Sequence, residues 1–161
     1  MKKLLLAIIL ISINLLAMSQ VVQPSANHLT DEACAILCKA ARDKSREMGL
    51  DISFAIADPD GMPRLFQRFG NALVLSATLV PNKAYTAAIT CTPTADLLPC
   101  VADGADLMGI NTCDSRITVV PGGVPLIVDG QIVGAIGVGG GTKEQDLPIA
   151  SHILSVFHYL Q

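Results

Sequence analysis

The chain has 161 residues, a length typical of one domain, and a formal net charge of −3 with no Trp and two Tyr. An acidic chain without a basic stripe argues against binding to nucleic acid, because the phosphate backbone requires clustered Lys and Arg. The shortage of aromatic residues also argues against a stacking platform for single strands.

Residues 1–19 have the pattern of a secretory signal peptide. Lys2 and Lys3 precede an apolar run, and Ala17 and Ser19 place small residues at the −3 and −1 positions of a cleavage site. An uncleaved N-terminal anchor is the alternative, although the run is short for a membrane span. We therefore expect an exported protein, periplasmic or secreted, with no stable membrane anchor after cleavage. Residues 20–28 are expected to form a tether and residues 29–161 the domain.

Five cysteines follow the signal peptide, and an odd number in an exported chain leaves at least one thiol unpaired or shared between chains. Cys34 and Cys38 are four residues apart on a predicted helix, which is a poor geometry for a disulfide. The chain contains no C-x-x-C pair, so the sequence does not indicate a zinc site or thioredoxin-like chemistry. We expect most of the five to be small buried apolar residues.

The first predicted element is a helix over residues 29–48. Thr30 is a favourable N-cap, acidic residues follow it, and Gly49 is a natural stop. Apolar residues at helical spacing predict one buried face: Ala33, Ile36, Leu37, Ala40 and Ala41.

A β-hairpin is predicted next, with strands over residues 52–57 and 63–69 joined by the turn Asp58-Pro59-Asp60-Gly61. Alternation along the second strand places Arg64, Phe66 and Arg68 on one face. A solvent-exposed face is the alternative to a binding role for the two arginines.

The middle of the chain predicts a helix within residues 73–90, followed by a short helix that Thr94 would cap, running to residue 102. Because proline is tolerated only early in a helix, Pro81 predicts that the regular part begins close to Val80. Residues 103–115 are polar and rich in turns. Their aspartates, Asp103, Asp106 and Asp114, do not have the spacing of a calcium loop.

The C-terminal part predicts a short strand over residues 117–120 and then a hairpin, 124–128 and 131–138, around Asp129-Gly130. This dipeptide between apolar runs favours a type I′ turn. Residues 139–141 are glycines that let the chain leave the sheet, and Thr142 with Gln145 predicts a capping box for the last helix. Pro148 indicates either a separate first turn or a helix that restarts at Asp146.

Strands therefore come in adjacent antiparallel pairs with helices between them, which predicts an α+β fold rather than a doubly wound parallel sheet. The glycine run before the last helix is neither a P-loop nor a dinucleotide fingerprint, and a tight strand exit explains it better than a phosphate cradle. The chain contains no G-x-S-x-G nucleophile elbow, which argues against a serine hydrolase. The missing C-x-x-C-H motif excludes covalent c-type haem, and the helical spacing of His152 and His158 prevents them from chelating one ion.

Several motifs resemble the GlcG/HbpS family, which includes the C-terminal domain of PduO-type corrinoid adenosyltransferases. They are VPNKAYTAA (80–88), GGVPL (122–126), VDG (128–130) and GAIGVGGGT (134–142) followed by EQD (144–146). Arg68 before Phe69-Gly70 and the turn at 58–61 add to the likeness, which covers residues 29–160. The chain departs from the family pattern at Gly140, where Ser is usual, and at Pro148.

The resemblance implies a profilin-like antiparallel sheet flanked by helices, a homo-oligomer and, for several members, haem binding. Our leading hypothesis is an exported haem- or tetrapyrrole-binding protein, acting in haem uptake, sensing or degradation. His28 is the expected axial (metal) ligand, Lys83 or Arg68 would lie near the propionates, and Tyr85 belongs to the expected binding set. The alternative is an enzyme or accessory protein for a small metabolite, linked to glycolate, diols or corrinoids, with residues 83–86 and 139–142 lining its site. A purely structural oligomer is the third interpretation.

Overall fold

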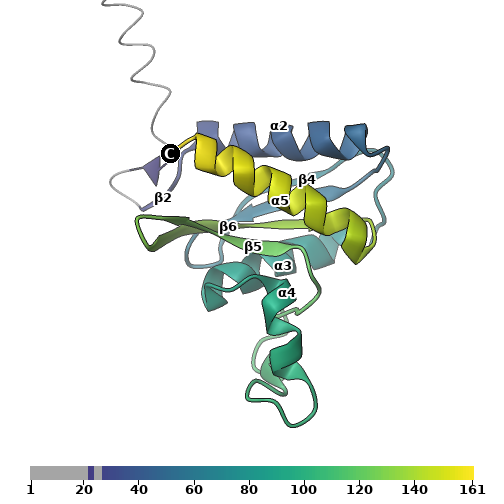
Figure 1. The fold of residues 1–161 in the computed structure, drawn as a ribbon, viewed down its shortest axis with the longest axis vertical. Helices are drawn as coiled ribbons and strands as arrows, with labels where there is room; N and C mark the ends of the chain where they lie inside the picture. Colours follow the sequence, from purple (N-terminus) through teal and green to yellow (C-terminus); the bar gives the residue numbers. More distant parts are fainter. Residues whose placement is uncertain (1–21, 24–26) are drawn as a thin grey trace, which may run out of the picture.

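A computed structural model describes residues 22–23 and 27–161, so the predicted signal peptide lies outside the described residues. One face of a four-stranded antiparallel sheet is covered by two helices, and the other face by a third (Figure 1). The strand order is β4-β3-β6-β5. These strands span Ser53–Ala57 (β3), Pro63–Arg68 (β4), Gly123–Val128 (β5) and Gln131–Gly139 (β6). The predicted α+β class is therefore confirmed.

The helices α2 (Asp31–Glu47) and α5 (Lys143–Tyr159) pack against each other on one face, and α3 (Ser76–Thr90) lies on the other. A two-stranded ribbon, β1 (Val22–Gln23) and β2 (His28–Leu29), precedes α2. A short helix, α4 (Thr94–Leu97), and the 3₁₀ helices η1 (Pro99–Val101) and η2 (Ile110–Thr112) project beyond the sheet (Figure 1). Among the described residues, none of the helices combines the length and apolar character needed to span a bilayer.

Each face of the sheet has its own core. The larger core lies under α2 and α5 and is built from branched and aromatic side chains such as Leu37, Phe54 and Phe157. The smaller one lies under α3 and consists largely of alanines, including Ala84 and Ala87. Small side chains permit α3 to approach the sheet closely, and this approach determines where the pockets on that face lie.

The α2 cap is confirmed, because the Thr30 hydroxyl accepts the Ala33 N–H at 3.1 Å. The predicted buried face is correct at its centre, where Ala33, Leu37 and Ala41 are buried, but Ile36 is exposed. The type I′ turn is also confirmed, because Asp129 and Gly130 both have positive φ, 50° and 77°.

The structure corrects both predictions made from prolines. Helix α3 begins at Ser76, five residues before Pro81, and α5 runs without interruption through Pro148. Each proline is the sixth residue of its helix and removes one N–H donor near the start. The α3 start is stabilised by the buried Val80, and the α5 start by the capping box, in which Gln145 accepts the Thr142 N–H at 2.9 Å.

Two further predictions were wrong. Residues 117–120 form no strand, although they lie close to α3 through the Thr118 N–H, which donates to the Thr86 hydroxyl at 2.9 Å. The helix predicted from Thr94 to residue 102 ends at Leu97 and continues as a 3₁₀ turn, because Pro99 supplies no N–H donor. Thr94 is not its cap. Its hydroxyl instead donates to Val120 and accepts from Gly123, both at 2.9 Å.

The cysteines are free thiols, and the expectation that most are buried was wrong. Cys34 is buried, Cys38 and Cys100 are half-buried, and Cys91 and Cys113 are exposed. Burial raises the pKa of the Cys34 thiol from 9.0 to about 11.

We expect iodoacetamide at pH 8 to modify Cys91 and Cys113 in the native protein while Cys34 stays intact, because the thiolate is the nucleophile. Peptide mass mapping checks this, and denatured protein, in which all sites react, is the control. Between pH 9.0 and about 11 the native state keeps a proton that the unfolded chain has lost, so ionisation of Cys34 lowers stability as pH rises through that window. Native modification of Cys34 at the rate of Cys91 would contradict the burial.

Candidate functional site

The four residues predicted to bind a ligand lie at separate places. His28 is on β2, Arg68 ends β4, and Lys83 and Tyr85 are on α3. Lys83, Tyr85 and Arg68 each line a different pocket. Within one copy of the chain, these four residues therefore do not surround a common ligand.

His28 is half-buried, and its Nδ1 lies 2.8 Å from Arg64 Nη1 and 2.9 Å from the Leu29 carbonyl oxygen. Arg64 reaches His28 because the β3–β4 pairing shifts register, so that Leu65 and Pro63 pair with β3 while Arg64 bulges. The prediction that Arg64 shares a face with Phe66 and Arg68 was therefore wrong. Arg64 Nη2 also donates to Asp31 on α2 at 2.7 Å.

Two tautomers of His28 suit these neighbours. If Nδ1 accepts from Arg64, the proton is on Nε2 and the ring has no lone pair for a metal. If Nδ1 donates to the Leu29 carbonyl, Nε2 is free to ligate, and the backbone bond orients the ring as in many metal-bound histidines. Of the two tautomers, only the second leaves a ring nitrogen available to a metal.

The Arg68 side chain is held by the connection between β4 and α3, where its Nε donates to the Ala72 carbonyl at 2.8 Å. It lines a hydrophilic pocket of about 300 Å³ together with Arg42, Arg46 and Asp51. The Asp51 carboxylate accepts the Asn71 N–H at 2.8 Å.

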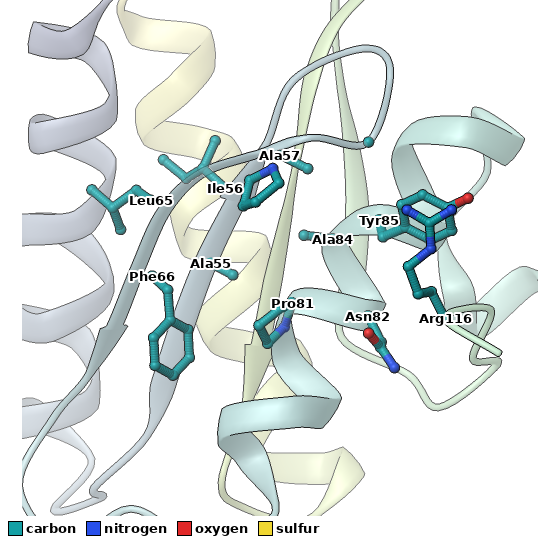
Figure 2. A pocket seen from close by; sticks show the side chains of 12 residues that line it. Ala55, Ile56, Ala57, Leu65, Phe66, Pro81, Asn82, Ala84, Tyr85 and Arg116 are labelled. Carbon is teal, nitrogen blue, oxygen red and sulfur yellow. The ribbon is translucent and has the colours of Figure 1, made fainter.

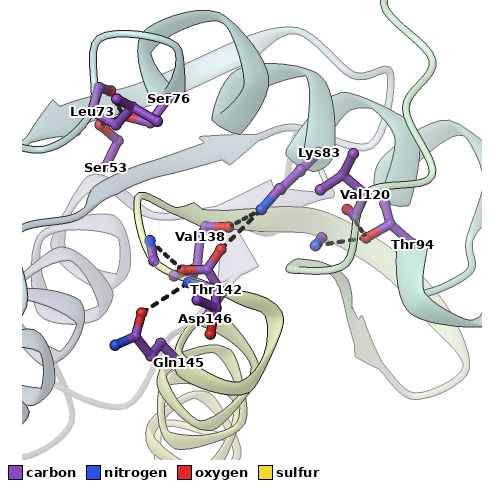
Figure 3. Close-up of polar contacts among 12 residues, drawn as sticks. Ser53, Leu73, Ser76, Lys83, Thr94, Val120, Val138, Thr142, Gln145 and Asp146 are labelled. Carbon is purple, nitrogen blue, oxygen red and sulfur yellow. Dashed lines mark hydrogen bonds and ion pairs between the residues drawn. The ribbon is translucent and has the colours of Figure 1, made fainter.

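Lys83 is fully buried at the junction of α3, β6 and α5 (Figure 3). Its Nζ donates to the Val138 carbonyl at 2.7 Å and to Asp146 Oδ2 at 3.2 Å. Asp146 Oδ1 accepts the Gly141 N–H at 3.0 Å, so this carboxylate joins the glycine run to α5. Burial lowers the pKa of Lys83, and the attraction of Asp146 opposes that shift.

Lys83, Gly140 and Gly141 line one pocket of about 230 Å³, whose other walls are mostly apolar. We call it the α3–α5 pocket. Its remaining lining residues are Leu73, Leu75, Ser76, Leu79, Val120, Pro121, Lys143 and Asp146. The small-metabolite hypothesis expected residues 83–86 and 139–142 to line one site. Of these, Lys83, Gly140 and Gly141 line this pocket, whereas Tyr85 lines a different one.

Tyr85 belongs to a polar cluster on the opposite side of α3. Its hydroxyl donates to Asp114 Oδ2 at 2.7 Å, and the Arg116 guanidinium carbon lies 3.9 Å from its ring centroid. Arg116 Nη2 also donates to Asp114 Oδ2 at 2.6 Å. Hydrogen bonds from Arg116 and Tyr85 hold the pKa of Asp114 well below its usual range, and the bond to Asp114 raises the pKa of Tyr85.

This cluster closes one end of an apolar pocket of about 150 Å³ between α3 and the β3–β4 hairpin, which we call the hairpin pocket. Figure 2 shows Phe66 and Pro81 toward one end, and Arg116 over Tyr85 at the other. Gly61 is required here, since a Cβ on it would come within 2.5 Å of the Tyr85 ring.

Sequence reasoning missed Arg116 and the role of Asp146. Arg116 lies in a loop without periodicity, so no pattern marked it. Asp146 was visible within a motif, but its partner Lys83 is 63 residues earlier, and no local spacing predicts such a pair. Among the residues that the structure describes, no three His, Cys, Asp or Glu side chains gather as a metal site.

Comparison with known proteins identifies a family, a relative of known sequence and two similar solved structures. The family model described as "Haem degrading protein HbpS-like" matches residues 29–155. A Citrobacter freundii protein, described as an uncharacterized 15.0 kDa protein in the dhaT-dhaS intergenic region, is 36% identical over 133 residues, 82% of this chain and 94% of that protein.

Two solved structures share the fold. The Klebsiella pneumoniae protein ORFY superposes with a TM-score of 0.79 and 33% identity, covering 83% of this chain and 92% of that one. The PduOC:heme complex superposes with a TM-score of 0.77 and 30% identity, covering 80% of this chain and 94% of that one.

Proposed function

Because the chain belongs to the HbpS-like family, we propose that it binds haem or a closely related tetrapyrrole. The observation that carries this proposal is the likeness, over most of both chains, to a solved relative crystallised as a heme complex. The predicted signal peptide supports the further proposal that binding occurs outside the cytoplasm, where haem uptake, sensing or degradation would use it.

The hairpin pocket supplies an apolar surface next to a cation, which is the combination a macrocycle with propionates requires. Its volume of about 150 Å³ is below the roughly 300–1,000 Å³ of pockets that enclose drug-sized ligands. A haem would therefore remain partly outside one chain. We accordingly propose that a homo-oligomer covers the rest of the ligand, with Arg116 near the propionates.

His28 does not line the hairpin pocket, so we propose it as the axial ligand of a haem held between copies of the chain, in the tautomer whose Nδ1–H donates to the Leu29 carbonyl. Adoption of this tautomer requires the Arg64 contact to be released. Replacing Arg64 by Met should then strengthen haem binding, and unchanged or weaker binding would contradict this competition.

The test is titration of haemin into the purified protein, followed by absorbance in the Soret region. We expect a saturable Soret shift that His28→Ala weakens by at least about tenfold in Kd. His152→Ala is the matched control, because His152 is exposed on α5 and should leave the titration unchanged. No Soret shift in the parent protein overturns haem binding, and an unchanged shift in His28→Ala overturns the ligand assignment alone.

A further inference from the structure

The α3–α5 pocket combines apolar walls with an excess of positive charge. Leu73 and Leu75 line it from the segment just before α3, Leu79 lines it from α3, and Val120 and Pro121 line it from the loop before β5. Its charged lining residues are two lysines and one aspartate. The N-terminus of α5, a helix of 17 residues, adds partial positive charge at the same end.

Lys83 has a hydrogen-bonding capacity that the fold does not use. An ammonium has three N–H donors, and the described residues supply two acceptors, Val138 and Asp146. Gly122 and Gly139 leave room for Nζ itself, since a Cβ on either would lie only 3.0 or 3.1 Å from it. A buried charge with an unused donor beside a pocket favours an anionic ligand, because an acceptor there would recover solvation lost on burial.

The size of the pocket limits what the ligand is. An apolar cavity of about 150 Å³ accommodates benzene, so about 230 Å³ suits a molecule slightly larger than that. The walls require an apolar body, and the Lys83 end requires one charged acceptor group. A planar carboxylate satisfies both requirements in a compact molecule.

We propose that the α3–α5 pocket binds a free small monocarboxylate with a short aliphatic or aromatic body, its carboxylate accepting from Lys83 Nζ. This site is separate from the hairpin pocket and does not depend on haem binding. The apolar part of the acid would contact Leu75, Leu79 and Val120, and Lys143 would attract the anion at the mouth.

The experiment compares acids with neutral analogues of the same shape on the purified protein. Benzoate and butyrate should raise the unfolding temperature in a saturable way at constant ionic strength, whereas benzamide and butyramide should not. Equal effects of acid and amide, or no effect of either acid, would overturn the proposal. Since haemin binding is followed by its Soret band, failure of either proposal is recognised independently of the other.

Two neighbouring substitutions locate the site without disturbing the buried pair. Leu75 lines the pocket and is 62% exposed, while Val74 does not line it and is 73% exposed. Because both side chains are largely exposed, we expect the protein to fold with Glu at either position. Leu75→Glu should weaken benzoate binding by about tenfold or more through like-charge repulsion, and Val74→Glu should change it little. Equal weakening in both variants, or displacement of benzoate by stoichiometric haemin, would contradict a separate carboxylate site.

Discussion

Lys83→Met is expected to lower the free energy of unfolding by about 3–5 kcal/mol, because it leaves the buried Asp146 carboxylate without its cation. Both side chains are almost fully buried, at 1% and 5% exposure, so hydration compensates little for the missing partner. The substitution also removes the donor to the Val138 carbonyl at the end of β6. Chemical denaturation followed by circular dichroism measures the effect.

A second variant tests whether an unpaired charge causes the loss. Asp146→Asn retains an oxygen for the Gly141 N–H but removes the charge, so the Lys83→Met/Asp146→Asn double variant should be more stable than Lys83→Met. The exposed pair of Lys39 and Asp43 on α2 is the matched control, and Lys39→Met should have no measurable effect. If the double variant is as unstable as the single one, the loss comes from packing rather than from charge.

Gly137→Ala is expected to be similarly damaging, because α3 lies directly over this residue of β6. A Cβ at Gly137 would be 2.2 Å from the Val80 carbonyl oxygen and 3.0 Å from the Ala84 nitrogen. Both neighbours are helix backbone, which cannot rotate away as a side chain can. We expect a loss of about 3 kcal/mol, the upper part of the range for overpacked cores.

The control for this prediction is Gly49→Ala, at the end of α2. A Cβ there meets nothing within 4 Å, so its cost of about 1 kcal/mol arises only from the positive φ of 67°. Thermal and denaturant unfolding compare the two variants. Equal losses would show that α3 can move away from β6, and would weaken the structural basis of both pockets beside it.

The predictions that succeeded depended on local chemistry. The Thr30 cap, the Asp129-Gly130 turn and the capping box at Thr142 each need only neighbouring residues, and all three are confirmed. The two proline predictions were wrong because the packing of α3 and α5 against the sheet offsets the free-energy cost of a proline inside each helix. The strand predicted at 117–120 failed because short apolar runs also serve as loops that pack on a helix.

In the candidate site, too, local motifs were predictable from the sequence and contacts between distant residues were not. Lys83 and the glycines near residue 140 stood out as motifs, and the structure places them around one pocket. Their link to Asp146, and the Arg116–Tyr85 contact, join residues far apart in the chain. The proximity of His28 to Arg64 depends on a β-bulge that alternation along β4 does not predict.

The sequence by itself determined the α+β class, most of the elements and the family, because periodicity, capping and turn chemistry act over a few residues. Only the tertiary structure decided that Lys83 is buried against Asp146, that the four predicted ligand residues are dispersed, and that two pockets flank α3. These features depend on how closely an alanine-rich helix approaches a glycine-rich strand, which is a property of packing between elements rather than of either element alone.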